Sequence, residues 1–168
     1  MVSQHFVDFA SAVVSENGED QKDCLLYPSN FSCQSLKYAI DNSNGSILIQ
    51  YKSRLKRKSI PRCYFETYFK LIKEDGRTIV IDGENSEHGK TAISKQECHM
   101  IFQSQSYTNK MSVTWKNLDM TSVTLRANSG QFQFVLINCF LKKSSVHQGF
   151  GPLDKKSWVT TFLSIHIL

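Results

Sequence analysis

Apolar and polar residues alternate along much of the chain, and this period of two predicts β-strands. In residues 64–71, Phe65, Thr67, Phe69 and Leu71 share one face of such a strand. A second alternating run extends from Arg77 to Asp82. Glu74-Asp75-Gly76 lies between the two runs and supplies the positive φ of a tight turn. The pattern therefore predicts an antiparallel β-hairpin.

Other segments have strand-like patterns, namely residues 46–51, 98–103, 111–116, 121–126 and 158–168. Residues 131–143 are almost continuously apolar, which suits both a strand covered on two faces and a buried helix. We interpret this segment as a strand. The residues that recur at strand period predict a core around one sheet, made of Phe65, Phe69, Leu71, Ile79, Ile81, Val113, Trp115, Val123 and Leu125.

Helical spacing is confined to the first quarter of the chain. Ser3 is placed to cap a first helix whose apolar face includes Phe6, Phe9 and Val13, and Asn17-Gly18 ends it. A second helix is expected from Ser32 to about Asp41, with Leu36 and Ile40 inward. We therefore expect a helix and a flexible acidic connector in residues 1–30, and a β-rich core domain in residues 31–168.

These elements predict an α+β fold. It has one β-rich domain with an antiparallel sheet of about seven or eight strands and two N-terminal helices. The composition agrees with a globular domain, since 40% of the 168 residues are hydrophobic and 21% are charged. Eleven phenylalanines favour strands over helices. The first residues lack the pattern of a signal peptide, and no apolar run is long enough to span a bilayer, so we expect a cytosolic or nuclear protein.

The five cysteines, Cys24, Cys33, Cys63, Cys98 and Cys139, are odd in number and include no C-x-x-C pair. We expect free, mostly buried thiols rather than a disulfide framework or a zinc site. Two N-x-S glycosylation sequons occur, at Asn30 and at Asn44. Without a secretory route, we interpret both as chance matches.

The charge is strongly clustered, and the net charge of +5 arises from one stretch. Residues 51–62 contain six basic side chains and no acidic one. Such a cluster attracts phosphates, anionic headgroups or acidic protein surfaces. A solvated loop without a partner is the alternative, and Leu55-Lys56-Arg57-Lys58 also resembles a short nuclear import signal. The predicted binding residues are Lys52, Arg54, Lys56, Arg57, Lys58 and Arg62.

No catalytic constellation is evident in the sequence. The five histidines are dispersed without a metal-ligand spacing, and no glycine-rich phosphate loop precedes a helix. Cys98 and His99 are adjacent, so in a strand they point to opposite faces and form no catalytic dyad. We therefore expect neither an enzyme nor a bound cofactor or metal.

The order of elements resembles that of the matrix proteins of negative-strand RNA viruses, closest to the plant-infecting rhabdoviruses. The resemblance rests on the helix Cys33 to Asp41, the basic stretch, the aromatic segment 64–72 and the ending Leu153-Asp154-Lys155-Lys156-Ser157-Trp158-Val159. Gly149-Phe150-Gly151-Pro152-Leu153 also looks like a turn near the end of the bornavirus matrix protein. The likeness covers about residues 33–168, and the acidic, proline-free start of the chain departs from the lysine-rich rhabdovirus tail.

This resemblance implies a viral structural protein that self-associates and bridges the nucleocapsid to the inner face of the virion membrane during budding. It implies a location in the virion and on membranes of the host cytoplasm, with the nucleus as a further possibility. The implied partners are further copies of the chain, the viral nucleocapsid and an anionic membrane surface. The alternative is an RNA-binding accessory protein, such as a silencing suppressor or movement protein, whose basic stretch binds RNA phosphates.

The acidic residues 16–23 and the basic stretch have complementary charges. A head-to-tail contact between the N-terminal arm of one subunit and its neighbour would build a filament or lattice. The predicted apolar anchors of this self-association are Phe6, Phe9 and Val13. Docking of the arm onto the chain's own sheet is the alternative.

Overall fold

The structure is a computed structural model that describes residues 10–52, 66–71, 76–83, 85–86, 89–93, 98–104, 110–129, 131–148 and 159–164. Within these ranges the secondary structure is mostly strand. The helices are short, α1 (Asp23–Leu26) and α2 (Leu36–Asn42). The strands are β1 (Ala10–Ser15), β2 (Ile47–Lys52), β3 (Glu66–Leu71), β4 (Thr78–Gly83), β5 (Asn85–Ser86), β6 (Gly89–Ala92), β7 (Cys98–Ser104), β8 (Lys110–Lys116), β9 (Leu118–Asp119), β10 (Val123–Ser129), β11 (Gln131–Ile137), β12 (Ser145–Gln148) and β13 (Val159–Ser164).

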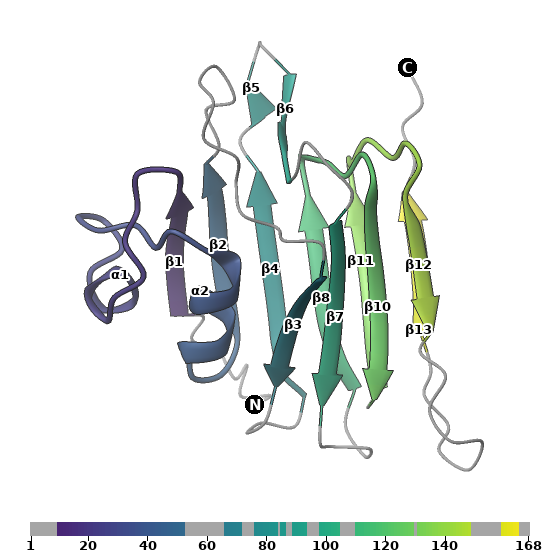
Figure 1. Ribbon diagram of the computed structural model, residues 1–168, viewed down its shortest axis with the longest axis horizontal. Helices are drawn as coiled ribbons and strands as arrows, with labels where there is room; N and C mark the ends of the chain where they lie inside the picture. The colour runs from purple at the N-terminus through teal and green to yellow at the C-terminus, as the bar shows by residue number, and fades with distance from the viewer. Residues whose placement is uncertain are drawn as a thin grey trace, which may run out of the picture.

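Two parallel sheets face each other and form a β-solenoid (Figure 1). The larger sheet has the strand order β1-β2-β4-β8-β11-β13, and the smaller has the order β12-β10-β7-β3. From β2 onward the chain passes alternately between these two sheets, so each coil adds one strand to each of them. The short strands β5, β6 and β9 form a third, small sheet.

The predicted antiparallel sheet is wrong. Among the described residues, nine of the ten strand pairings are parallel and only β5 with β6 is antiparallel. The expected hairpin is also wrong, because β3 pairs with β7 whereas β4 pairs with β2 and β8. Gly76 does have a positive φ of 77°, but its turn precedes β4 in the other sheet. Alternation identifies which face of a strand is buried, but it does not determine which strand pairs with it.

The core fills the space between the two sheets. Of the predicted core residues, Phe65 and the side chain of Leu71 lie outside the described part of the structure. The other seven are confirmed as buried, namely Phe69, Ile79, Ile81, Val113, Trp115, Val123 and Leu125. Residues 131–137 form a strand, as we interpreted them, and place Phe132 and Phe134 in the same core.

Two corners of the solenoid repeat from coil to coil. Asn117 follows β8 and Asn138 follows β11, and both have a positive φ, of 55° and 51°. Asn138 Nδ2 donates to Asn117 Oδ1 at 2.7 Å, and Asn117 Nδ2 donates to Asp82 Oδ1, also at 2.7 Å. Ser122 and Lys143 repeat the positive φ at the next corner. Polar ladders and matching turns thus hold successive coils in register.

The N-terminal end departs from the predicted first helix. Residues 10–15 form β1, which pairs in parallel with β2, so the helix is wrong for this part of the segment. Ala12 and Val14 are buried at strand period, while Val13 is half-buried on the other face. In a segment this short, the spacing of apolar residues fits both the helical and the strand period, and pairing with β2 selects the strand.

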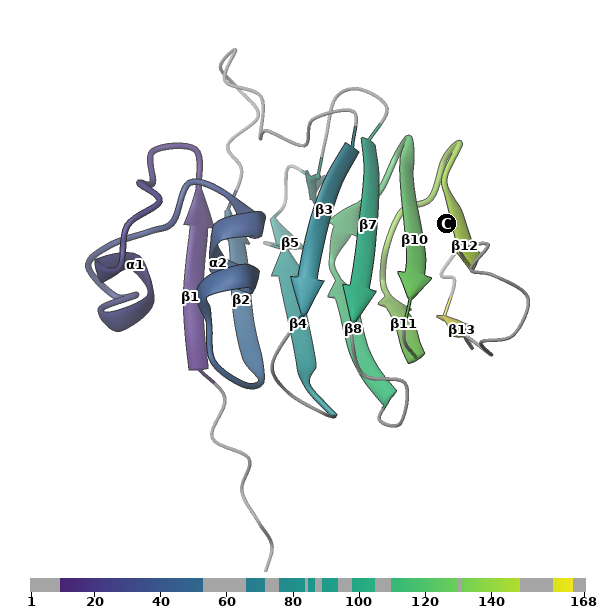
Figure 2. The same cartoon turned by 60° about the horizontal axis from the view of Figure 1, so that its bottom comes forward.

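The second predicted helix is present but begins later than expected. It starts at Leu36, because Ser35 rather than Ser32 is the N-cap and accepts a hydrogen bond from Tyr38 N. Leu36 and Ile40 are buried, as predicted. The helix lies beside β3 in front of β1 and β2, and it continues the layer of the smaller sheet (Figures 1 and 2). At its C-terminal end, the buried Arg77 donates to Ile40 O at 2.9 Å.

Candidate functional site: a polar groove beside β1 and β2

Residues 16–35, which we call the cap segment, lie along the outer edge of β1. Cys33 N donates to Val13 O at 2.8 Å, and Ser15 N donates to Cys33 O at 3.0 Å. These bonds form a short parallel bridge between Cys33 and Val14. Helix α1 belongs to the cap segment and lies on the far side of β1 from β2 (Figures 1 and 2). The cap segment therefore occupies part of the edge where another strand could add.

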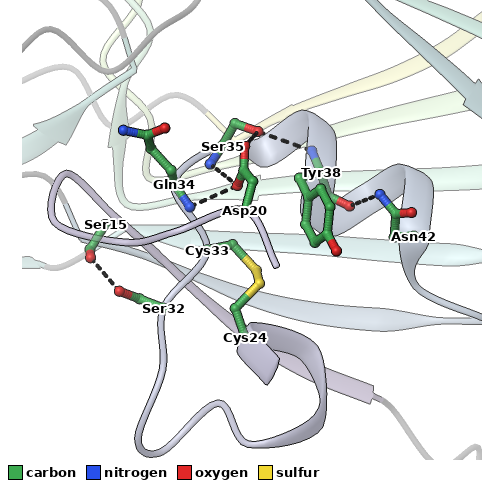
Figure 3. The surroundings of a disulfide bond; sticks show 9 residues. All are labelled: Ser15, Asp20, Cys24, Ser32, Cys33, Gln34, Ser35, Tyr38 and Asn42. Carbon is green, nitrogen blue, oxygen red and sulfur yellow. Dashed lines mark hydrogen bonds between the residues drawn. A yellow bond between two sulfur atoms is a disulfide. The ribbon is translucent and has the colours of Figure 1, made fainter. Parts of the chain in front are cut away.

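A disulfide between Cys24 and Cys33 closes the cap segment (Figure 3). Their Cα atoms are 5.1 Å apart, and both residues are fully buried. Cys98 is disulfide-bonded as well, while Cys139 is a free, buried thiol. The expectation of free thiols is thus correct for Cys139 and wrong for these three cysteines. Cysteine spacing alone does not specify pairing in a fold whose coils bring distant segments together.

The acidic connector is hydrogen-bonded to the start of α2. Asp20 accepts from Gln34 N at 2.8 Å, from Ser35 N at 2.9 Å and from Ser35 Oγ at 2.7 Å (Figure 3). The hydroxyls of Ser15 and Ser32 hydrogen bond to each other at 2.7 Å. Asp20 therefore stabilises contacts within the subunit.

Between the cap segment and the ends of β1 and β2 lies a groove of about 400 Å³. This volume is within the usual range for small-ligand sites. Hydroxyl and amide side chains predominate in its lining, with one carboxylate, one ammonium group and an exposed aromatic ring. The lining residues are Val13, Ser15, Glu16, Asn17, Pro28, Ser29, Asn30, Phe31, Ser32 and Lys52.

The charged groups of the groove come from the ends of adjacent strands. Lys52 is exposed at the end of β2, and Glu16 directly follows β1. Tyr51 is only 5% exposed beside them, and its burial together with the negative charge of Glu16 raises its pKa well above the usual value. The Tyr51 hydroxyl therefore stays protonated and uncharged at neutral pH.

The groove contains two of the predicted site residues. Lys52 and Val13 both line it, and the carbonyl of Val13 is already bonded to Cys33 N. The other predicted binding residues, Arg54, Lys56, Arg57, Lys58 and Arg62, lie outside the described residues, as do Phe6 and Phe9. Sequence reasoning missed the contribution of the cap segment. The pair Cys24 and Cys33, read as a possible disulfide, was the one signal that could have indicated it.

The described residues contain no group of three or more His, Cys, Asp or Glu side chains that could hold a metal ion. On β7, Cys98 is buried and His99 is half-buried, and the adjacent residues point to opposite faces as predicted. None of the helices in the described ranges is long and apolar enough to span a membrane. No family model, curated protein or solved structure matches this chain.

Proposed function

We propose that this protein is a non-catalytic binding module for a polyanionic polysaccharide, one that bears sulfate or carboxylate groups. The observation that carries the proposal is the position of Lys52. It lines the polar groove and is also the first of the six basic residues in residues 52–62. A ligand in the groove would therefore contact the first cation of the most basic stretch of the sequence.

The lining of the groove suits a sugar. Ser15, Ser29 and Ser32 supply hydroxyls, and Asn17 and Asn30 supply amides. Both kinds of group donate and accept hydrogen bonds, as sugar hydroxyls do. Phe31 is 43% exposed and adds an apolar surface to the lining.

Binding is favoured over cleavage by the number of acids in the groove. Among the lining residues that the structure describes, Glu16 is the only carboxylate. Glycoside hydrolysis generally uses a pair of carboxyl groups on either side of the scissile bond. A single carboxylate among hydroxyls, amides and one lysine suits recognition of a sugar.

The disulfide bears on the class of polyanion. Disulfides persist in oxidising compartments and are rare in the cytosol, where ribonucleoproteins and the inner faces of membranes are found. The buried pair Cys24 and Cys33 therefore favours an extracellular or lumenal ligand. The matrix-type adaptor and the RNA-binding protein remain the alternatives that a binding experiment separates.

The test is a titration of the full chain with a heparin-type sulfated hexasaccharide. A neutral hexasaccharide, a single-stranded RNA and vesicles of anionic phospholipid are titrated in parallel. We expect saturable binding of the sulfated hexasaccharide that weakens steeply between about 50 and 200 mM salt, and no binding of the neutral one. Tighter binding of the RNA or of the vesicles would contradict the proposal.

Matched lysine variants locate the binding site. Lys52→Gln removes the cation in the groove, and we expect about fivefold weaker binding, equivalent to about 1 kcal/mol per cation. Lys142→Gln removes an exposed lysine after β11 that does not line the groove, and it should leave binding unchanged. Equal effects of the two substitutions would mean that the groove has no part in binding.

A further inference from the structure

The disulfide between Cys24 and Cys33 bears on the two N-x-S sequons, at Asn30 and Asn44, because both modifications belong to the same compartment. N-x-S sequons are modified only in chains that enter the secretory route, which is also an oxidising route. Cys24 and Cys33 are paired, and Cys98 is also disulfide-bonded. The disulfide bonds therefore favour a chain that enters the secretory route, where its N-x-S sequons can be modified.

Asn44 is placed to carry a glycan. It is exposed in the turn that joins α2 to β2, and the next residue, Gly45, has a positive φ of 75°. A bulky modification there would extend into solvent without displacing the core. Asn44 precedes β2 whereas Lys52 ends it, so the modification would also leave the polar groove open.

Ser46, the third residue of this sequon, has a structural role of its own. Its Oγ accepts a hydrogen bond from Thr78 N at 3.0 Å, which ties the start of β2 to the start of β4. The presence of a serine at this position is therefore explained without glycosylation. Asn44 is exposed whereas Ser46 holds Thr78, so a test of the modification must separate the two residues.

We infer that the chain folds in the lumen of the secretory pathway and is N-glycosylated at Asn44. In the reaction, Asn44 Nδ2 forms a bond to C1 of an oligosaccharide carried on a polyisoprenyl diphosphate. The bond from C1 to the diphosphate oxygen breaks, the polyisoprenyl diphosphate leaves, and the amide loses one proton. No oxidant or reductant takes part. This inference does not depend on the ligand of the groove.

The test is expression of the full chain in eukaryotic cells with a cleavable secretory signal peptide fused before Met1, followed by digestion of the secreted protein with peptide N-glycanase in ¹⁸O-labelled water. Removal of a glycan converts its asparagine to a labelled aspartate, so each sequon is read separately by peptide mass, and a parallel sample without the glycanase identifies label that arises from spontaneous deamidation of Asn44-Gly45. We expect the labelled conversion at Asn44 and an intact bond between Cys24 and Cys33. Secreted, folded protein whose Asn44 peptide is unlabelled would overturn the inference.

Variants around the turn separate glycosylation from the structural role of Ser46. Asn44→Gln should abolish the labelled peptide and leave the fold intact, because Asn44 is exposed. Ser46→Thr keeps both the sequon and a hydroxyl for Thr78 N, so the label should persist. Asn42→Gln changes an exposed asparagine outside any sequon, so it should also leave the label at Asn44 unchanged. Both variants keep the sequon, so loss of the label in either of them would show that the label at Asn44 does not arise from glycosylation of this sequon.

Discussion

Aromatic side chains join the two sheets of the solenoid at its centre. Phe69 of β3 stacks on Phe102 of β7, with ring centroids 4.7 Å apart. Phe102 also contacts Trp115 of β8 and Phe134 of β11, at 6.3 and 5.3 Å between centroids. Offset and edge-to-face aromatic pairs stabilise a core beyond the area they bury. Single residues in this cluster therefore contribute to both sheets.

Replacing Phe69 by Ala should lower the free energy of unfolding by about 3 to 5 kcal/mol, through lost burial and a cavity beside Phe102. Equilibrium unfolding in urea measures the change. Ser112→Ala on the outer face of β8 is the matched control, and we expect a change within about 0.5 kcal/mol. A loss below about 1 kcal/mol for Phe69→Ala would place its side chain outside the core.

Tyr51 should make stability depend on pH in the alkaline range. Burial and Glu16 raise its pKa in the folded protein above the ordinary value of about 10. Above that pH the unfolded chain ionises Tyr51 while the folded protein does not, so the free energy of unfolding decreases as pH rises. Below it, Tyr51 contributes no pH dependence. Tyr51→Phe should remove this decrease, measured by urea unfolding between about pH 8 and 11. An identical alkaline slope in both proteins would show that Tyr51 ionises freely.

At the scale of elements, the side chains of Asp82, Asn117 and Asn138 form a hydrogen-bonded ladder at the corners of successive coils. Two substitutions of Asn117 test how much this ladder contributes to stability. Asn117→Gly keeps the positive φ and removes both side-chain hydrogen bonds, so we expect a loss of about 1 to 3 kcal/mol. Asn117→Ala adds the cost of a β-carbon in the left-handed region, about 1 kcal/mol more. Thermal unfolding of the two variants checks the order. Equal stability of the alanine variant and the native chain would show that the ladder does not stabilise the corner.

The positions of most strands could be predicted from the sequence, and their partners could not. Alternation correctly places β4, β8 and β10 and their buried faces, because burial of one face is a local property. Pairing is decided by the path of the chain, and a turn at Gly76 is compatible both with a hairpin and with a passage between sheets. The apolar spacing of residues 6–14 suits a helix and a strand alike. Residues 10–15 form the strand β1 because they pair with the neighbouring β2.

The positive charge of the candidate site is the one feature of it that the sequence predicts. The basic stretch is evident from composition, and Lys52 does line a groove. The groove itself depends on the cap segment, whose place beside β1 is set by the disulfide, by Asp20 and by the bonds to Cys33. These are contacts between segments that a linear pattern does not contain.

At the scale of the whole molecule, the two ends of the solenoid differ. At the N-terminal end, the cap segment covers part of the edge of β1 through Cys33. At the other end, β13 and β12 are the last strands of their sheets among the described residues. Head-to-tail stacking would need the covered edge of β1, whereas contact between two C-terminal ends would close after two copies.

We therefore predict no species larger than a dimer for the native chain in analytical ultracentrifugation. The double variant Cys24→Ser and Cys33→Ser should lose about 2 to 4 kcal/mol of stability and form larger, open-ended species, because the edge of β1 becomes available. Cys139→Ser removes the buried free thiol and is the matched control for loss of a cysteine. Large assemblies of the native chain would instead support the predicted self-association through the N-terminal arm.

The most direct measurement of the proposed binding is amide NMR of the full chain titrated with the sulfated hexasaccharide. The account predicts the largest shift changes at residues 15–17, 29–32 and Lys52, which line the groove. Amides on β8 and β11 should stay unchanged. Saturable changes confined to residues away from the groove, or no changes at all, would contradict the account.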